Sequence, residues 1–169
     1  MKKLFLTFAF AVCAMAMNAQ LYVGGEVGAW RDWDANQTTF FVQPEVGYNL
    51  NDQWAVGLEL GYKNNYNNGA KENVFGLAPY ARYTFAKFGS VNLFVDGGLA
   101  YYASDAAGDP KSFQVGVKPG VAVNLTEKLS FVSHVGFLGY RDSDLIGQDS
   151  GLGFNLDGQD LSFGLYLNF

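Results

Sequence analysis

The chain has 169 residues, with 11 basic and 16 acidic side chains and a formal net charge of −5 at pH 7. This acidic balance excludes nucleic-acid-binding proteins that depend on a basic surface. Beyond the N-terminus, no segment approaches the roughly 20 consecutive apolar residues of a transmembrane helix. If the chain crosses a membrane, it must cross as strands.

The N-terminus has the pattern of a secretory signal peptide. Lysines at positions 2 and 3 precede a short apolar run at residues 4–17, and a small residue, Ala19, follows close behind. The run is too short for a spanning helix. We expect residues 1–19 to be a signal peptide cleaved after Ala19, and residues 20–169 to form one mature domain.

The only cysteine, Cys13, lies inside that apolar run. The mature domain should therefore contain no thiol, which excludes a disulfide framework and cysteine chemistry. Lipid attachment at Cys13 is disfavoured, because Val12 is bulkier than the small residue expected there and little apolar sequence precedes it.

Period-two alternation of apolar residues predicts an all-β chain of eight strands. The predicted strands are Leu21–Trp30, Thr38–Tyr48, Trp54–Lys63, Asn73–Phe85, Val91–Tyr102, Ser112–Asn124, Leu129–Tyr140 and Gln159–Phe169. Their lengths match the roughly 9–11 residues of a tilted transmembrane strand and exceed the roughly five or six of an ordinary soluble strand.

The connections between these strands alternate in length. The short ones are Asn49–Gln53, Ala86–Ser90 and Leu125–Lys128, and the longer, polar ones are Arg31–Gln37, Asn64–Glu72, Ala103–Lys111 and Arg141–Gly158. This alternation requires an even strand count with both chain ends on the short-turn side. Short periplasmic turns and longer external loops are typical of outer-membrane barrels.

A proline precedes each short turn by a similar interval, at Pro44, Pro79 and Pro119. Proline removes one hydrogen bond of a strand ladder and normally argues against an interior strand. We expect these three prolines to mark a shared bulge near the rim of the sheet.

The two faces of the strands differ in bulk. One face is apolar and bulky, and we expect it to include Phe137; the other combines glycines with polar groups, and we expect it to include Tyr140. An eight-strand barrel has an interior just wide enough for its own side chains. The bulky face should therefore point outward to lipid, with aromatic residues near both ends of the strands forming the two interfacial girdles.

The last strand carries a sorting pattern. Its residues Ser162, Gly164, Leu167 and the terminal Phe169 resemble the assembly signal of outer-membrane barrels. Over its mature length the chain resembles the small outer-membrane β-barrel superfamily that contains OmpA-barrel, OmpX and OmpW-like proteins. The resemblance implies an eight-stranded antiparallel transmembrane β-barrel, closed by pairing of the last strand with Leu21–Trp30.

Charged residues are expected inside this barrel. They are Glu26, Glu45, Glu59, Lys63, Arg82, Asp96, Lys118 and His134. Arg82 and Asp96 should lie diagonally across neighbouring strands, within ion-pair reach. A paired, hydrogen-bonded plug is the favoured interpretation, since charges out of bulk water must be compensated. A narrow polar conduit is the alternative.

The sequence disfavours two chemical sites, a catalytic histidine–serine pair and a calcium-binding loop. His134 shares its face with Ser130, but the two lie about 13 Å apart along a strand, too far for a nucleophile–base pair. The last long loop contains several aspartates without the glutamate and the remaining ligands of a calcium loop; these are Asp142, Asp144, Asp149 and Asp157. We expect no enzyme activity, cofactor or metal.

The sequence therefore predicts an exported, integral outer-membrane barrel of a Gram-negative-type cell. Two function classes remain open: a structural or interaction barrel of the envelope, and a porin-like or OmpW-like conduit for small solutes or hydrophobic ligands. The expected partners are outer-membrane lipid and lipopolysaccharide, and the assembly machinery through the C-terminal strand, with no nucleic acid.

Overall fold

A computed structural model of the chain describes residues 20–32, 37–67, 70–106, 108, 110–142, 150–155 and 162–169. Regular structure in these ranges is antiparallel sheet. The strands are β1 Leu21–Asp32, β2 Gln37–Asn49, β3 Trp54–Asn67, β4 Ala70–Phe88, β5 Val91–Ser104, β6 Lys111–Asn124, β7 Leu129–His134, β8 Phe137–Arg141, β9 Gly151–Asn155 and β10 Ser162–Asn168. Within the described ranges, no helix is long and apolar enough to span a membrane.

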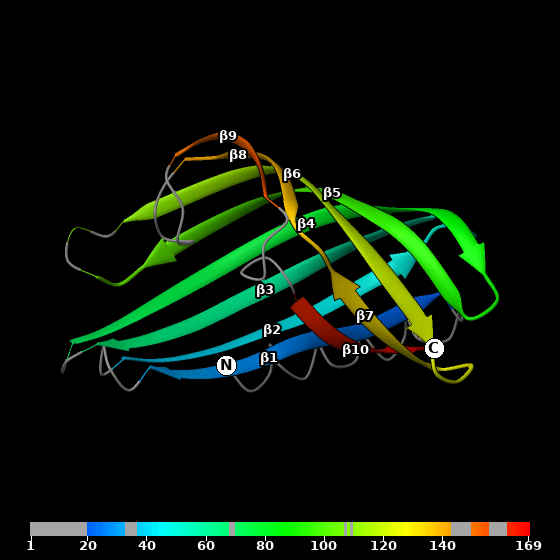
Figure 1. Cartoon of the computed structure of the whole chain (residues 1–169), viewed down its shortest axis with the longest axis horizontal. Coiled ribbons are helices and arrows are strands. Elements are labelled where there is room, and N and C mark those ends of the chain that lie inside the picture. Colours follow the sequence, from blue (N-terminus) through cyan, green and yellow to red (C-terminus); the bar gives the residue numbers. More distant parts are fainter. Residues whose placement is uncertain are drawn as a thin grey trace, which may run out of the picture.

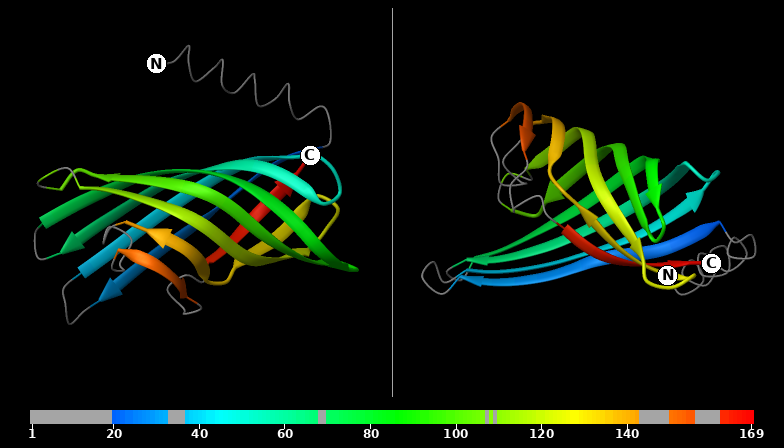
Figure 2. Two further views of the ribbon diagram at one scale, coloured as in Figure 1. Left: turned by 90° about the horizontal axis from the view of Figure 1, so that it is seen from above. Right: turned by 45° about the vertical axis from the view of Figure 1, so that its right-hand side comes forward.

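The sheet closes on itself as a barrel of eight strands in the order β1-β2-β3-β4-β5-β6-β7-β10 and back to β1. The long strands β2 to β5 run obliquely from one end to the other (Figures 1 and 2). The short strand β8 lies beside the outer half of β6, and β9 pairs with the other edge of β8. Closure joins Tyr22–Gly25 of β1 to Leu165–Asn168 of β10. Closed pairing satisfies backbone groups where hydrocarbon offers no alternative partner.

The short turns have local causes. Asn51 accepts hydrogen bonds through its Oδ1 from the backbone N–H groups of Gln53 and Trp54, at 2.9 Å each. Thr126 does the same through its Oγ1 for the N–H groups of Lys128 and Leu129, at 3.2 and 3.0 Å. Side-chain oxygens of this kind stabilise tight turns. All short turns lie at the end of the barrel where β1 begins and β10 ends, as predicted.

Several predicted boundaries were wrong at the long-loop end. Strands β3 and β4 extend to Asn67 and from Ala70, well into the predicted Asn64–Glu72 loop, because they remain paired from Asn64–Asn73 out to Asn67–Ala70. Strand β9 was missed altogether, since its residues had been assigned to the long loop after Arg141. Its glycine-rich sequence weakens the alternation on which strand prediction depends.

The predicted seventh strand is two strands, β7 and β8, separated by Val135 and Gly136. Gly136 has φ of 74°, a left-handed conformation that favours glycine. The pairing with β6 shifts by one residue across this bulge, and a one-residue slip exchanges the two faces. Phe137 is therefore buried, not lipid-facing, and Tyr140 is 42 % exposed, not inward: both expectations were wrong.

The proline expectation was wrong for two of the three sites. The registers of β2–β3 and β4–β5 are the same on either side of Pro44 and Pro79, so the ladder skips pairs there without a bulge. Pro119 lies opposite the β7–β8 break, and its carbonyl accepts a hydrogen bond from the Val135 N–H at 2.9 Å. All three prolines are exposed on the outer surface.

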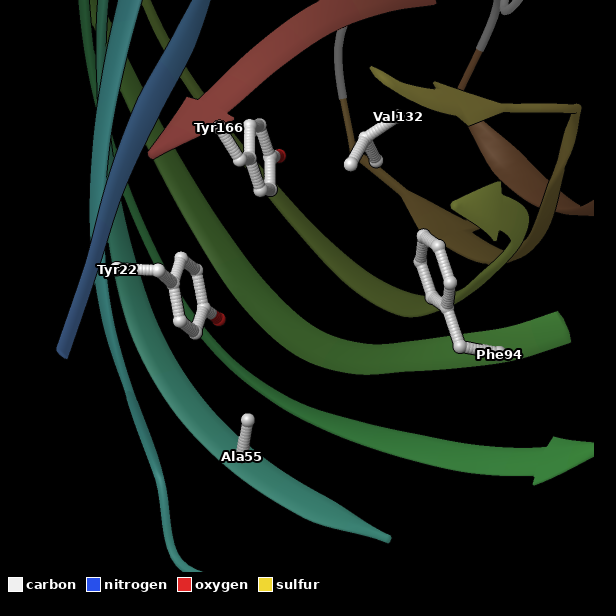
Figure 3. Packing of buried hydrophobic residues seen from close by; sticks show 5 residues of the cluster. All are labelled: Tyr22, Ala55, Phe94, Val132 and Tyr166. Atoms are coloured by element: carbon white, nitrogen blue, oxygen red, sulfur yellow. The ribbon is translucent and has the colours of Figure 1, made fainter. Parts of the chain in front are cut away.

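The two faces of the wall are otherwise divided as predicted. Large apolar side chains point outward, among them Phe75 at 58 % and Leu165 at 55 % exposure. A buried cluster lies inside the barrel near the short-turn end, formed by Tyr22, Ala55, Phe94, Val132 and Tyr166 (Figure 3). Its members come from β1, β3, β5, β7 and β10, so it ties the closing strands to the rest of the wall.

Candidate functional site

The centre of the lumen is an ion pair between Arg82 of β4 and Asp96 of β5. The two residues are direct register partners, not the diagonal neighbours expected. The Arg82 Nε and Nη2 donate to the two Asp96 carboxylate oxygens, both at 2.7 Å. This bidentate geometry is the strongest arrangement available to a guanidinium, and both side chains are buried.

His134 of β7 extends the pair across the barrel. Its Nε2 lies 2.8 Å from the Asp96 Oδ2, and its Nδ1 lies 3.5 Å from the Glu26 Oε1. The imidazole also packs edge-on against Phe94, with ring centroids 5.4 Å apart. The histidine thus links the β1 and β5 walls through two carboxylates.

Glu45 of β2 completes the other side. One of its carboxylate oxygens accepts a hydrogen bond from the Tyr80 hydroxyl and the other from the Tyr166 hydroxyl, and Tyr22 is hydrogen-bonded to Tyr80. The Arg82 Nη2 lies 3.7 Å from the nearer Glu45 oxygen. Glu26, Glu45, Arg82, Asp96 and His134, with the three tyrosines, are called the plug below.

Aromatic rings surround the Arg82 guanidinium. The guanidinium carbon lies 4.0 Å from the Phe94 ring centroid and 5.3 to 5.8 Å from those of Tyr22, Tyr80 and Tyr166. Cation–π attraction of this kind adds to the ion pairs where water is excluded. Tyr22 and Tyr166 were absent from the predicted charged set, although both share the polar alternation of their strands.

The remaining predicted interior charges lie apart from the plug. Glu59 accepts a hydrogen bond from the Gln43 Nε2 at 3.1 Å. Lys118 lines the same cavity as Glu59 and is attracted electrostatically to its carboxylate. Lys63 is half-buried towards the long-loop end, opposite Phe41 and Val74, and the described residues give it no ion pair.

Cavities of unequal size adjoin the plug on its two sides among the described residues. On the long-loop side, Glu59, Lys118 and Phe137 help to line a cavity of about 40 Å³, room for only one to a few waters. On the short-turn side, a cavity of about 530 Å³ reaches inward to Arg82, Tyr22 and Tyr166. We call the second space the vestibule.

Comparison with known proteins identifies the family. The family model described as the outer membrane protein beta-barrel domain matches residues 4–169. The chain belongs to this family. The solved N-terminal β-barrel domain of OprF from Pseudomonas aeruginosa is similar in fold, with a TM-score of 0.52 and 19 % identity, over 89 % of this chain and 98 % of that one. No curated protein matches the chain.

Strand pairing in the barrel brings a serine opposite His134 that strand spacing alone does not predict as a catalytic partner. Ser162 of β10 is the register partner of His134. Both ring nitrogens of the histidine already face carboxylates, however, and no hydrogen bond to Ser162 forms among the described residues. A general base needs a free nitrogen within hydrogen-bond reach of its nucleophile, which this arrangement does not provide.

The residues of the expected assembly signal lie on the closing strand of the barrel. Leu167 is exposed on the outer surface and Gly164 is buried inside. The Phe169 N–H donates to the Leu21 carbonyl at 2.9 Å, so the terminal residue is held against the first strand. Leu167 and Phe169 therefore lie at the seam where the last strand pairs with the first, whereas Ser162 and Gly164 pair with β7.

A polar cluster holds the long-loop ends of β4 and β5 together. Asp105 accepts hydrogen bonds from the backbone N–H of Asn73 at 2.7 Å and from its Nδ2 at 2.6 Å. Hydrogen bonds to the ionised carboxylate, first from the side chain and then from the backbone of Asn73, hold the pKa of Asp105 below its ordinary value.

Of the aspartates in the expected acidic loop, the described residues include only Asp142. Asp142 accepts a hydrogen bond from the Phe113 N–H at 2.8 Å and so caps the pairing of β6 with β8. Asp144, Asp149 and Asp157 lie outside the described residues, as does the predicted signal peptide at 1–19. In the described part of the chain, no group of acidic or histidine side chains is placed to hold a metal ion.

Proposed function

We propose that the protein is a structural and interaction barrel of the outer membrane whose lumen is closed by the plug. One observation carries this proposal: buried side chains from six strands meet in the plug, and the cavity that adjoins it on the long-loop side holds only about 40 Å³. The charges that fill the centre are ion-paired and hydrogen-bonded, as their removal from bulk water requires. A barrel so filled contributes a rigid wall and presents its long loops outside the cell.

Conductance of the refolded mature barrel in a planar lipid bilayer tests the closed lumen. We expect no steady open pore. As a matched pair of variants with ordinary Cβ contacts, Gly61→Leu fills the lumen and Gly97→Leu adds the same side chain on the lipid face. A steady wild-type conductance that Gly61→Leu abolishes and Gly97→Leu preserves would overturn the proposal.

A narrow porin-like or OmpW-like conduit is the second candidate. The vestibule favours it, because this cavity of about 530 Å³ extends inward as far as Arg82, Tyr22 and Tyr166 of the plug. The same bilayer measurement separates the two candidates. A wild-type current that rises when Tyr22 and Tyr166 are both replaced by alanine would support the conduit.

We propose that two targeting signals direct this protein: the signal peptide at residues 1–19 for export, and the terminal strand for membrane insertion. The residues of the second signal are Ser162, Gly164, Leu167 and Phe169. The terminal strand would be recognised by the assembly machinery before lipopolysaccharide and lipid surround the finished barrel. Deleting Phe169 should impair insertion while the signal peptide is still removed. The control is Phe163→Ala, which removes another outward-facing aromatic of β10 and should insert normally.

We propose further that the barrel is not an enzyme. The occupation of both His134 ring nitrogens by carboxylates supports this, together with the absence of a hydrogen-bonded serine among the described residues. Mass spectrometry of lipid A from cells with and without the protein tests it. A mass shift that disappears in His134→Ala would overturn the conclusion.

A further inference from the structure

The vestibule is lined by amides and hydroxyls in an unusual concentration. The inward positions nearest the short turns on six different strands are Asn49, Thr84, Asn92, Asn124, Ser130 and Asn168. Each follows the inward alternation of its own strand, so the ring is a consequence of the fold. Tyr22 and Tyr166 of the plug, with Phe94, also line this cavity; Figure 3 shows these three side chains inside the barrel wall.

Some side chains of this ring are hydrogen-bonded to one another, and others have donors and acceptors left for a ligand. The Ser130 hydroxyl donates to the Asn124 Oδ1 at 2.9 Å, and the Asn168 Nδ2 donates to the Ser130 Oγ at 3.1 Å. The side chains of Asn49, Thr84 and Asn92 form no hydrogen bond within the described part of the chain. The ordered trio fixes one wall, while the other presents free donors and acceptors.

The charge of the vestibule is nearly balanced. Arg82 is the only cation in its lining, and Asp96 and Glu45 already compensate it. Glu127 is the only acid in the lining, and it lies exposed in the short turn. A lining of this kind offers little to an ion and many hydrogen bonds to a neutral solute.

We infer that the vestibule is a binding site for a short neutral saccharide that enters from the short-turn side. Its volume of about 530 Å³ lies within the usual range of small-ligand pockets, and aromatic rings stand at its blind end. A saccharide presents several hydroxyls that can each donate and accept a hydrogen bond, which suits a wall of amides and hydroxyls. An extended peptide is disfavoured, since it would pair with a free strand edge, whereas this space ends at the plug.

The test is titration of the full mature barrel, refolded in a detergent without a sugar headgroup, with diacetylchitobiose and separately with maltose. Amide NMR should show saturable shifts confined to the ends of the strands around the vestibule. In Asn92→Leu the binding should weaken about tenfold or more, the effect of removing a hydrogen-bonding group from the site. Gln53→Leu is the control, because it changes an exposed amide of the same end outside the vestibule and should bind normally.

The two sugars separate an N-acetylated amino sugar from a plain glucose unit, and saturable binding of either supports the inference. No saturable binding of either sugar at millimolar concentration would overturn it. So would binding that Asn92→Leu leaves unchanged, or a preference for a neutral tripeptide over both sugars. Heat-dependent gel mobility of each variant verifies that its barrel is folded, so a loss of binding reports on the vestibule itself.

Discussion

The middle and the short-turn end of the lumen are built by the same strands from different chemistry. In the middle, β4 and β5 contribute Arg82 and Asp96, which are buried and ion-paired. Further towards the turns, β4 contributes Thr84, one alternation from Arg82, and β5 contributes Phe94 and then Asn92, where a cavity of about 530 Å³ opens. Charged side chains therefore lie where the lumen is filled, and uncharged polar side chains lie where the cavity opens.

This difference has a physical cause. A charge removed from water destabilises the fold unless partners compensate it, so the middle of the lumen tolerates charges only as a closed network. A neutral amide near bulk water has no such requirement and can remain unpaired. Side chains in the middle should therefore be intolerant of change, and those of the vestibule should be tolerant.

The largest effect should follow from Asp96→Asn, which removes the carboxylate that compensates the Arg82 charge and is hydrogen-bonded to His134. We expect the free energy of unfolding to fall by about 3–5 kcal/mol, measured by urea unfolding of the barrel refolded in lipid vesicles. Asn92→Ala, in the vestibule on the same strand, should change it by less than about 0.5 kcal/mol. Equal effects of the two variants would remove the distinction between the regions.

A smaller effect should come from Gly98→Ala, which tests how tightly the middle is packed. A Cβ at position 98 would lie 2.6 Å from the Pro79 carbonyl oxygen, so backbone must move, and we expect a loss of about 1–3 kcal/mol. Gly97→Ala is the control, because its Cβ would meet only Val117, at an ordinary 3.7 Å. If both variants unfold at the same urea concentration, the middle of the lumen has room that the structure does not show.

The bulge at Gly136 should contribute about 1–2 kcal/mol, because an alanine in the left-handed conformation is strained. Gly136→Ala should lower the urea midpoint and perturb the NMR signals of Phe137, which the bulge turns into the lumen. Gly61→Ala has ordinary Cβ contacts, the nearest at 3.5 Å, and should leave both unchanged. An unperturbed Phe137 in Gly136→Ala would show that the reversal of faces has another cause.

The smallest effect should be seen outside the lumen, at Asp105. Because its folded-state pKa is lowered by Asn73, its contribution to stability is present above the unfolded pKa and is lost as pH falls through the folded pKa. The backbone amide signal of Asn73 should titrate with a midpoint below the ordinary aspartate range. In Asn73→Ala the Asp105 midpoint, followed on its own amide signal, should rise; no rise would mean that the side-chain bond is unimportant.

The alternation of apolar and polar residues in the sequence predicts the strands of the barrel wall and their two faces. Four predicted strands begin at the same residue as the observed ones: β1 at Leu21, β3 at Trp54, β5 at Val91 and β7 at Leu129. The outward direction of the apolar face followed from volume alone. These features are local or depend only on chain geometry, since side chains of a strand alternate whatever it pairs with.

The failures cluster where alternation is interrupted. Nothing in the composition near residue 136 distinguishes a glycine that packs inside from one that forms a bulge, so the faces of Phe137 and Tyr140 were exchanged. The glycine-rich β9 was missed for a similar reason. A bulge is decided by the register of the neighbouring strand, here β6, which the local sequence does not contain.

By itself the sequence determined an eight-stranded membrane barrel with a narrow, charged interior, because periodicity and side-chain volume are properties of the chain. Only the tertiary structure decided which charges meet. The register of β4 against β5 set Arg82 directly opposite Asp96, and barrel closure brought His134 and the tyrosines of β1 and β10 to the same layer. The plug and the vestibule both depend on groups from six or more strands, and their distances exist only after the sheet has closed.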